Sequence, residues 1–267
     1  MDTVGCWSVS DSVRGYPLRA FVICLIAYTT AQMDLALFGY AVPAIRGEFG
    51  LTLSEVMAIV SAAFLLGGAL LVVLGWLADR VGRLPLFQFS LLGSSFLVAL
   101  ISIAPGVATL TALRGASIAV GGLSYPITGA IITEEMPARL RGLFMGLLQI
   151  GYPLGWALAS LWSMWLLTEY GWRQLFWVGL VSLPMVWVVR RYLREPPRSV
   201  VARSTEPPPR FSDLFATGIR ERAITLFIAQ FLFVWAYSAS IFLFPSFLRE
   251  VRALDAFNFS LLIGAGN

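Results

Sequence analysis

The chain has 267 residues, of which 58% are hydrophobic and only 13% are charged. No soluble core of this size needs so much apolar surface, so the composition indicates a membrane protein. The chain contains no histidine, which excludes histidine metal sites, serine–histidine hydrolysis and histidine proton relays.

Long apolar stretches follow one another along the chain. A helix that crosses a bilayer needs about 20 mostly apolar residues, and lipid cannot satisfy an open sheet edge, so these stretches are predicted to be helices. Seven spans are expected near residues 18–45, 52–77, 85–105, 107–134, 142–168, 173–193 and 221–247, and an eighth is expected to begin near residue 258. No removable signal peptide is expected at the start of the chain.

The arginines between these spans predict the orientation of the chain. Pairs of arginines precede span 1 and follow spans 2 and 4, and eight more lie between Arg190 and Arg222. The opposite side has Arg46, Arg173, Arg249 and Arg252. The positive-inside rule therefore predicts a cytoplasmic N-terminus. The expected location is the inner (plasma) membrane of the cell, with several membrane passes. Because membrane topology explains the positions of the arginines, their positive charge does not indicate a nucleic-acid partner, and none is expected.

The spans group into two unequal units. Residues 1–193 are predicted to form one six-span unit, and residues 194–220, which contain Pro207-Pro208-Pro209, a cytoplasmic linker. Residues 221–267 are expected to form an incomplete second unit with span 7 and the start of span 8.

Two charges are predicted to lie deep in the membrane, Asp34 in span 1 and Arg114 in span 4. Each alone costs about 3 kcal/mol on insertion scales. Helical rise places Asp34 roughly 16 Å and Arg114 roughly 10 Å from the same membrane surface, so the two side chains are expected to meet. A purely structural ion pair between two helices is the alternative to a functional pair.

A short charged turn separates spans 2 and 3. Its residues are Gly75, Asp79, Arg80, Gly82 and Arg83. Their types and spacing resemble the signature between spans 2 and 3 of the major facilitator superfamily, with Leu84 in place of a second trailing basic residue. A topology anchor with chance glycines is the alternative.

Further matches extend this resemblance over nearly the full chain. They are Glu134, Pro137, Arg141 and Gly142 after span 4, Gln149 in span 5, Gly171-Trp172-Arg173 with Phe176 at the start of span 6, and Glu195-Pro196-Pro197-Arg198 after it. The resemblance implies an all-α membrane protein: an N-terminal bundle of six helices, built from two inverted three-helix repeats, and the start of a C-terminal half. Members of the superfamily normally have twelve spans, so a chain truncated after span 7 is expected.

The resemblance also implies roles for the buried charges. Sugar porters of the superfamily use an aspartate in span 1 and an arginine in span 4 for proton coupling, which assigns that role to Asp34 and Arg114. When Arg114 turns toward a substrate anion, Asp34 in a low dielectric should take up a proton. No cofactor is expected, and protons are the expected coupling ion.

Candidate substrate contacts lie on several spans. Arg114, Ser117, Gly121, Tyr125 and Thr128 recur at helical spacing and predict one polar stripe along span 4. The predicted substrate-binding residues are Arg114, Tyr125, Gln149, Gln230 and Tyr237.

A cytoplasmic gate is expected where the motifs meet. Its predicted residues are Gly75, Asp79, Arg80, Gly82, Arg83, Glu134, Arg139, Arg141 and Glu195. Exposed ion pairs are individually weak, so a network of them suits a gate that opens repeatedly. Solvated loop charges without a gating role are the alternative.

These features predict a secondary transporter that carries a small organic acid anion with a proton by alternating access. Span 7 lacks the glutamine pair of the sugar porters, and Phe244-Pro245-Ser246-Phe247-Leu248 and the Met33–Pro43 stretch are more similar to organic acid symporters. A sugar or polyol symporter and a non-transporting multi-span receptor are the alternatives. Gly151-Tyr152-Pro153-Leu154-Gly155 is only faintly similar to an antiporter motif.

An enzyme is not expected. The expected partners are the lipid bilayer and a small molecule, and no oligomer is implied.

Overall fold

The computed structural model describes residues 15–195 and, beyond them, short stretches and single residues between 220 and 262. Over this part, the regular secondary structure is helical. Six helical stretches are long and apolar enough to cross a membrane: Tyr16–Phe49, Leu53–Ala78, Arg83–Ile101, Val107–Glu135, Ala138–Glu169 and Trp172–Tyr192. The predicted spans 1 to 6 are confirmed. The predicted linker and most of spans 7 and 8 lie outside the described residues.

The first two helices have clear start and stop signals. Helix α2 (Tyr16–Phe49) ends at Gly50, whose φ of 62° is the left-handed conformation that favours glycine. Helix α3 (Leu53–Val81) begins with a capping box, in which the Thr52 hydroxyl accepts the Glu55 N–H and the Glu55 carboxylate accepts the Thr52 N–H. Span 3 follows as α4 (Arg83–Ile101), directly after Gly82.

Spans 4, 5 and 6 are each interrupted within the membrane. Span 4 consists of α5 (Val107–Gly122) and α6 (Ser124–Glu135). Span 5 consists of a 3-10 turn, η1 (Ala138–Leu140), followed by α7 (Arg141–Gln149) and α8 (Gly151–Glu169). Span 6 consists of α9 (Trp172–Leu175), the 3-10 segment η2 (Phe176–Ser182) and α10 (Leu183–Tyr192).

A proline lies at the start of the second α-helix in each of these three spans. Pro126, Pro153 and Pro184 lie in the first turn of α6, α8 and α10, respectively. Proline lacks the N–H that would bond to the carbonyl four residues earlier, so the helix ladder is broken there. Two of the junction residues bond by the tighter 3-10 pattern instead: Leu123 N–H donates to Val120 at 3.4 Å, and Ile150 N–H donates to Leu147 at 3.2 Å.

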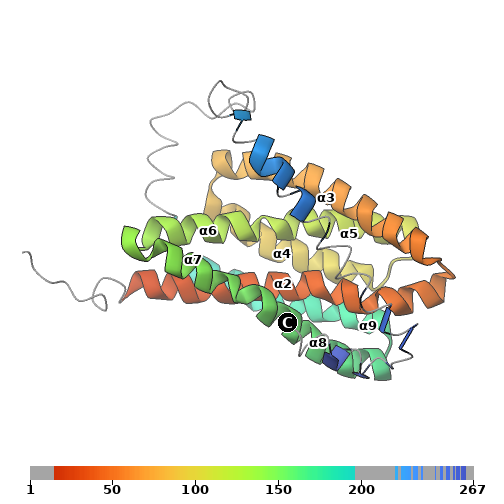
Figure 1. Ribbon diagram of the computed structural model, residues 1–267. Helices are drawn as coiled ribbons and strands as arrows, with labels where there is room; N and C mark the ends of the chain where they lie inside the picture. The colour runs from red at the N-terminus through yellow and green to blue at the C-terminus, as the bar shows by residue number, and fades with distance from the viewer. Residues whose placement is uncertain are drawn as a thin grey trace, which may run out of the picture.

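The helices pack as a bundle along a common direction (Figure 1). Helix α2 packs along α8, α3 along α5, and α4 against η2. Span 1 therefore pairs with span 5, and span 4 with span 2. If spans 1, 2 and 3 correspond to spans 4, 5 and 6, the pair of spans 1 and 5 corresponds to the pair of spans 4 and 2. Two related three-helix repeats predict this correspondence.

Glycines bring the paired helices together. A Cβ on Gly155 of α8 would lie 2.6 Å from both Gln32 Cβ and the Thr29 carbonyl oxygen of α2. A Cβ on Gly67 of α3 would lie 2.7 Å from Ile118 and 2.9 Å from the Gly115 carbonyl oxygen of α5. Small residues allow this close packing in lipid, where helices associate through van der Waals contact.

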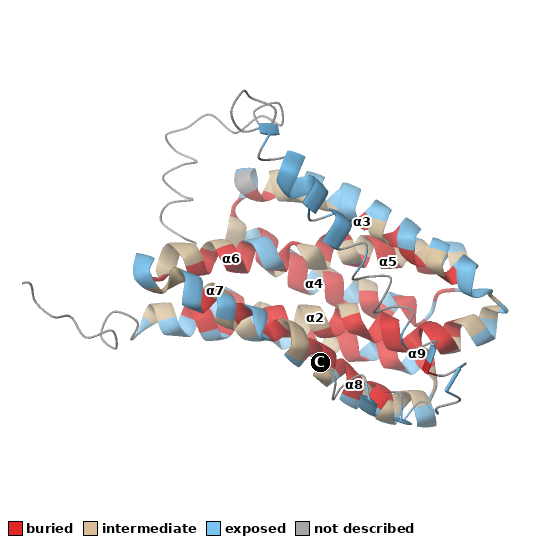
Figure 2. Cartoon of the chain, in the orientation of Figure 1, coloured by how far each residue is buried: buried red, intermediate tan, exposed pale blue. Residues whose placement is uncertain are grey.

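The outer surface of the bundle is apolar. Large exposed side chains include Leu65, Val72 and Val73 on α3 and Leu161 and Trp165 on α8. Figure 2 shows the buried residues concentrated in α2, α4 and α5, while exposed residues follow the outside of α3. Lipid solvates such a surface, so this exposure fits a bundle embedded in a bilayer.

Candidate functional site

Asp34 lies in the middle of α2 and is buried, with 3% of its surface exposed. Its Oδ2 accepts a long hydrogen bond, 3.4 Å, from the hydroxyl of Ser182 at the end of η2. Its Oδ1 has no hydrogen-bond partner among the described residues. A carboxyl group that is buried with an unsatisfied oxygen is costly and points to a functional role.

Arg114 reaches the same turn of α2 from α5. Its side chain is 2% exposed, and Nη2 donates to the Leu35 carbonyl at 2.8 Å. The guanidinium carbon lies 4.6 Å from the centre of the Phe38 ring. Asp34 and Arg114 are the two formally charged groups among the buried residues that the structure describes. Arg114 thus binds the carbonyl next to Asp34 and the face of an aromatic ring, and no ion pair joins its guanidinium to the carboxylate.

Two serines extend the polar contacts of Asp34 into spans 3 and 6. The hydroxyls of Ser95 on α4 and Ser182 lie 2.6 Å apart. Ser95 is also 2.6 Å from the Leu91 carbonyl, and Ser182 is 2.6 Å from the Gly179 carbonyl. Both serines are at most 1% exposed. The sequence analysis missed them, although serines within otherwise apolar spans are a usable signal for buried polar contacts.

A second polar cluster joins spans 1, 4 and 5. Gln149 donates from Nε2 to the Tyr125 hydroxyl at 3.0 Å, and its Oε1 accepts from the Tyr28 hydroxyl at 3.3 Å. The rings of Tyr28 and Tyr125 are 5.6 Å apart between centres. Tyr125 is 43% exposed, whereas Tyr28 is buried. The structure therefore brings together two predicted substrate contacts, Tyr125 and Gln149, with Tyr28, which the sequence analysis did not identify.

Arg114, the other predicted substrate residue that the structure describes, lies apart from this cluster. Arg114 precedes Tyr125 by 11 positions on the same span, which is roughly 16 Å at helical rise. Ser117 and Thr128 of the predicted stripe are buried, while Tyr125 is exposed. The break at Leu123 separates the two parts of the stripe. Gln230 and Tyr237 lie outside the described residues.

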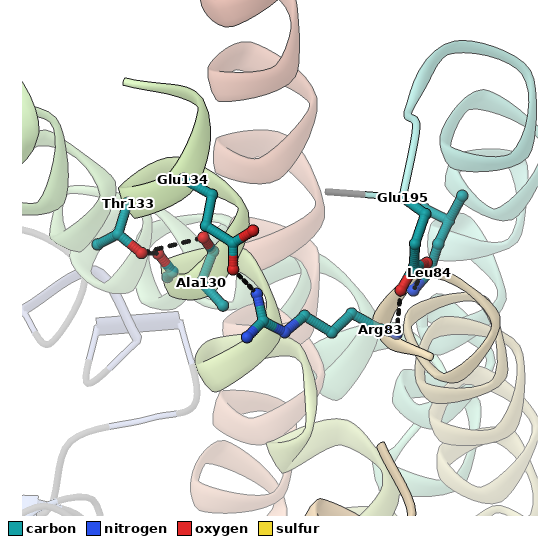
Figure 3. A network of polar contacts seen from close by, with 7 residues as sticks. Arg83, Leu84, Ala130, Thr133, Glu134 and Glu195 are labelled. Carbon is teal, nitrogen blue, oxygen red and sulfur yellow. Dashed lines mark hydrogen bonds and ion pairs between the residues drawn. The ribbon is translucent and has the colours of Figure 1, made fainter. Parts of the chain in front are cut away.

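Three predicted gate residues meet at one end of the bundle (Figure 3). The Arg83 guanidinium forms an ion pair with the Glu134 carboxylate at the end of α6. The carboxylate of Glu195, which follows span 6, accepts the backbone N–H groups of Arg83 and Leu84, each at 2.9 Å. An acid at the start of α4 accepts hydrogen bonds from backbone N–H groups that have no partner within the helix. Its negative charge also interacts favourably with the positive end of the helix dipole. Arg83 thus connects spans 3, 4 and 6.

The remaining predicted gate residues whose side chains the structure describes do not join this group. Arg80 lies over the Trp76 ring of its own helix, 3.8 Å from the ring centre. Arg141 donates from Nε to the Met136 carbonyl at 3.1 Å, and Arg139 is exposed. Gly75 lies within α3, and Gly82 separates α3 from α4 with a φ of 122°. The side chain of Asp79 lies outside the described part of the chain.

The opposite end of the bundle has a network that the sequence analysis did not predict. Glu48 at the end of α2 accepts from Arg173 Nη2 and from Trp172 Nε1, each at 2.6 Å. Arg173 Nη1 also donates to the carbonyls of Ser102 and Ala104, at 2.9 and 3.2 Å. A cation at the end of α4 complements its dipole. Arg173 at the start of span 6 and Glu195 just after it therefore supply a charged partner to each end of span 3.

The Arg83–Glu134 pair predicts a measurable coupling. The side chains are 25% and 12% exposed, so we expect about 1 kcal/mol of coupling, at the upper end for surface pairs. The measurement is a double-mutant cycle of thermal stability in detergent with Arg83→Gln, Glu134→Gln and the double variant. The pair Arg139→Gln and Glu134→Gln provides the control and should be additive. Additivity in the Arg83 cycle would contradict the interaction.

Comparison with known proteins gives a consistent assignment. The sequence profile of the Major Facilitator Superfamily matches residues 24–267. The cis,cis-muconate transport protein of Acinetobacter baylyi is 31% identical over 180 residues, covering 66% of this chain and 43% of that protein. The probable 4-methylmuconolactone transporter of Cupriavidus pinatubonensis is 26% identical over 224 residues, covering 81% of this chain and 51% of that protein.

A solved structure shows the same fold. It is a bacterial homologue of the human lysosomal transporter Spinster in an inward-facing, unoccupied conformation. It superposes with a TM-score of 0.69 at 19% identity, covering 95% of this chain and 60% of that one. The chain spans about half the length of the curated relatives described above. With the six-helix bundle and a profile match over most of its length, the chain is a multi-pass membrane protein that belongs to the Major Facilitator Superfamily.

Proposed function

We propose that this chain belongs to a proton-coupled secondary transporter that carries a small organic acid anion by alternating access. The single observation that supports this most is the convergence of Asp34 and Arg114 on one buried turn of α2. Ionisable groups at this depth are expensive and mark ion or substrate pathways. The two relatives described above are a muconate transport protein and a probable methylmuconolactone transporter, which supports an organic acid as the substrate here.

The proposal gives each site residue a role. Asp34 carries the proton, and Arg114 is the cation that attracts the carboxylate of the substrate. Arg114 is held by one carbonyl and an aromatic face rather than by an ion pair, so its guanidinium keeps donors for a bidentate carboxylate. Tyr125 and Gln149, supported by Tyr28, are proposed to contact the rest of the substrate. Gln230 and Tyr237 remain proposed contacts from span 7.

We also propose an orientation in the inner membrane with a cytoplasmic N-terminus. The end of the bundle that contains Arg83, Glu134 and Glu195 then faces the cytoplasm. These contacts connect spans 3, 4 and 6, so they stabilise the bundle end against opening. The partners are the bilayer and a small carboxylate, and the coupling ion is the proton.

The test is substrate-driven proton movement. The complete gene that encodes this chain is expressed, and the protein is reconstituted into liposomes that contain a trapped pH-sensitive dye. Adding cis,cis-muconate outside should acidify the interior, and a protonophore should abolish muconate accumulation. Protein-free liposomes control for passive permeation of the acid.

Two other probes separate the alternatives. Benzoate tests whether the site accepts an aromatic monocarboxylate, and glucose tests the sugar alternative. Proton movement with glucose but with neither acid would overturn the proposed substrate class. Equilibration of muconate without proton movement would overturn proton coupling, and binding without any flux would support a receptor.

A further inference from the structure

Asp34 has polar neighbours on two different helices. Arg114 approaches from α5 and binds the adjacent carbonyl, while Ser182 approaches from η2 and lies 3.4 Å from Oδ2. Arg114 is the charged side chain that faces Asp34 within the described part of the bundle, and the elements of spans 3 and 6 contribute the serine hydroxyls. A cation favours an ionised carboxylate, whereas a hydroxyl oxygen can accept from a protonated one.

The number of serine hydroxyl protons indicates which protonation state of Asp34 the two serines stabilise. Ser95 and Ser182 have one hydroxyl proton each, yet three contacts of 2.6 Å compete for these two protons. When Ser182 donates to the Gly179 carbonyl and Ser95 supplies the proton between the two hydroxyls, no proton remains for Asp34. Ser182 Oγ then still has one lone pair free. A protonated Asp34 can donate to it, whereas an ionised Asp34 gains little at 3.4 Å.

The shape of span 6 places Ser182 at this point. A Cβ on Gly179 would lie 2.8 Å from Val98 Cγ1 and 3.4 Å from the Ser95 carbonyl, so glycine allows η2 to approach α4 closely. Ser182 lies one turn later, at the end of the 3-10 segment and immediately before α10. A 3-10 segment within a helix often marks a functional position. Here it brings the two hydroxyls together.

We propose that Ser182, supported by Ser95, is a positioning residue whose hydroxyl oxygen accepts a hydrogen bond from protonated Asp34, while Arg114 favours the ionised state. This inference rests on the proposed function of Asp34 as the proton carrier and adds the group that accepts a hydrogen bond from its protonated form. Loading the proton then replaces the electrostatic attraction of the nearby Arg114 by a closer hydrogen bond to Ser182, and this bond couples spans 1, 3 and 6. The 3.4 Å contact should shorten when Asp34 is protonated, since hydroxyl hydrogen bonds are usually about 2.7–2.8 Å long.

The primary test is an infrared pH titration of the reconstituted protein, which needs no transported substrate. The carbonyl stretch of protonated Asp34 is identified as the band that Asp34→Asn removes. Ser182→Ala should shift this band to higher frequency, because the acid loses its acceptor. It should also lower the apparent proton affinity about fivefold to tenfold, the usual net contribution of one neutral buried hydrogen bond. The midpoint of the titration then shifts to lower pH.

Matched variants exclude a general packing effect. Ser90 is a fully buried serine on α4 whose hydroxyl has no partner among the described residues, so Ser90→Ala should leave the band and the midpoint unchanged. Ser95→Ala should produce a smaller shift than Ser182→Ala, in the same direction. It provides the measurement if Ser182→Ala does not fold.

Three outcomes would overturn the inference. They are an unchanged band in Ser182→Ala and Ser95→Ala, a midpoint shifted to higher pH, or an equal effect of Ser90→Ala. A shift to higher pH would mean that Ser182 donates to the ionised acid. If wild-type liposomes move no protons with substrate but the infrared shifts occur, the proposed function fails while the serine contact stands. If transport occurs without the shifts, the inference alone fails.

Discussion

The Asp34→Asn variant is expected to abolish accumulation of substrate against its gradient while retaining part of the exchange activity. Asparagine has nearly the same shape and can still bond to Ser182, but it cannot take up or release a proton. Asp34 is the one buried carboxyl group among the described residues, so no other buried acid there can carry the proton in its place. The accumulation ratio of labelled cis,cis-muconate in liposomes with an imposed pH gradient should fall to one, and counterflow should continue.

Glu48→Gln is the matched control for this experiment. It makes the same chemical change on the same helix, at a carboxylate that binds Arg173 and Trp172 at the end of the bundle. This variant is expected to keep uphill uptake, with some loss of thermal stability. Accumulation by Asp34→Asn at the wild-type level would remove Asp34 from the mechanism.

The Gly155→Ala variant is expected to cause the largest loss of stability. The added Cβ would lie 2.6 Å from the Thr29 carbonyl oxygen and 2.8 Å from the Met33 nitrogen. These are backbone atoms, so no side chain can rotate away, and α8 must separate from α2. Overpacking in a dense interior costs about 1–3 kcal/mol or more. We expect a melting temperature in detergent that is lower by at least several degrees.

Gly146 provides the comparison for Gly155. It lies on α7 of the same span, and a Cβ there would meet nothing within 4 Å. Gly146→Ala should be neutral or slightly stabilising, because alanine is the better helix former by about 1 kcal/mol. Equal melting temperatures for the two variants would mean that the contact between α2 and α8 does not determine stability.

The positions of the spans could be predicted because the bilayer imposes a length and a composition on each of them. The expected spans 1 to 6 agree with the observed helices to within a few residues at most ends. The interruptions in spans 4 to 6 were not predicted, although Pro126, Pro153 and Pro184 were visible in the sequence. A proline in an apolar stretch shows only that the helix loses one backbone hydrogen bond. Packing against the neighbouring helices determines whether the helix bends at that position.

The candidate site could be predicted only in part. Asp34 and Arg114 stand out in a sequence because buried charges are rare, and the structure brings them to one turn of α2. Their actual partners, the Leu35 carbonyl and Ser182, depend on how each helix is rotated about its axis. Close contacts at Gly155 and Gly179 set that rotation, and such contacts cannot be derived from hydropathy. Motif spacing likewise identified Arg83, Glu134 and Glu195 but did not show that Glu195 binds backbone amides.

The carboxylate of Glu195 binds amides that precede it by more than 100 positions. Ribosomes synthesise the start of α4 long before this partner, so the nascent helix enters the bilayer with those amides bound to water. The amides of Arg83 and Leu84 can gain this partner only after the chain has been synthesised through Glu195. A ribosome stalled before codon 195 should therefore hold an intermediate in which the junction at Gly82 and Arg83 is open to protease, and release of the stall should protect it.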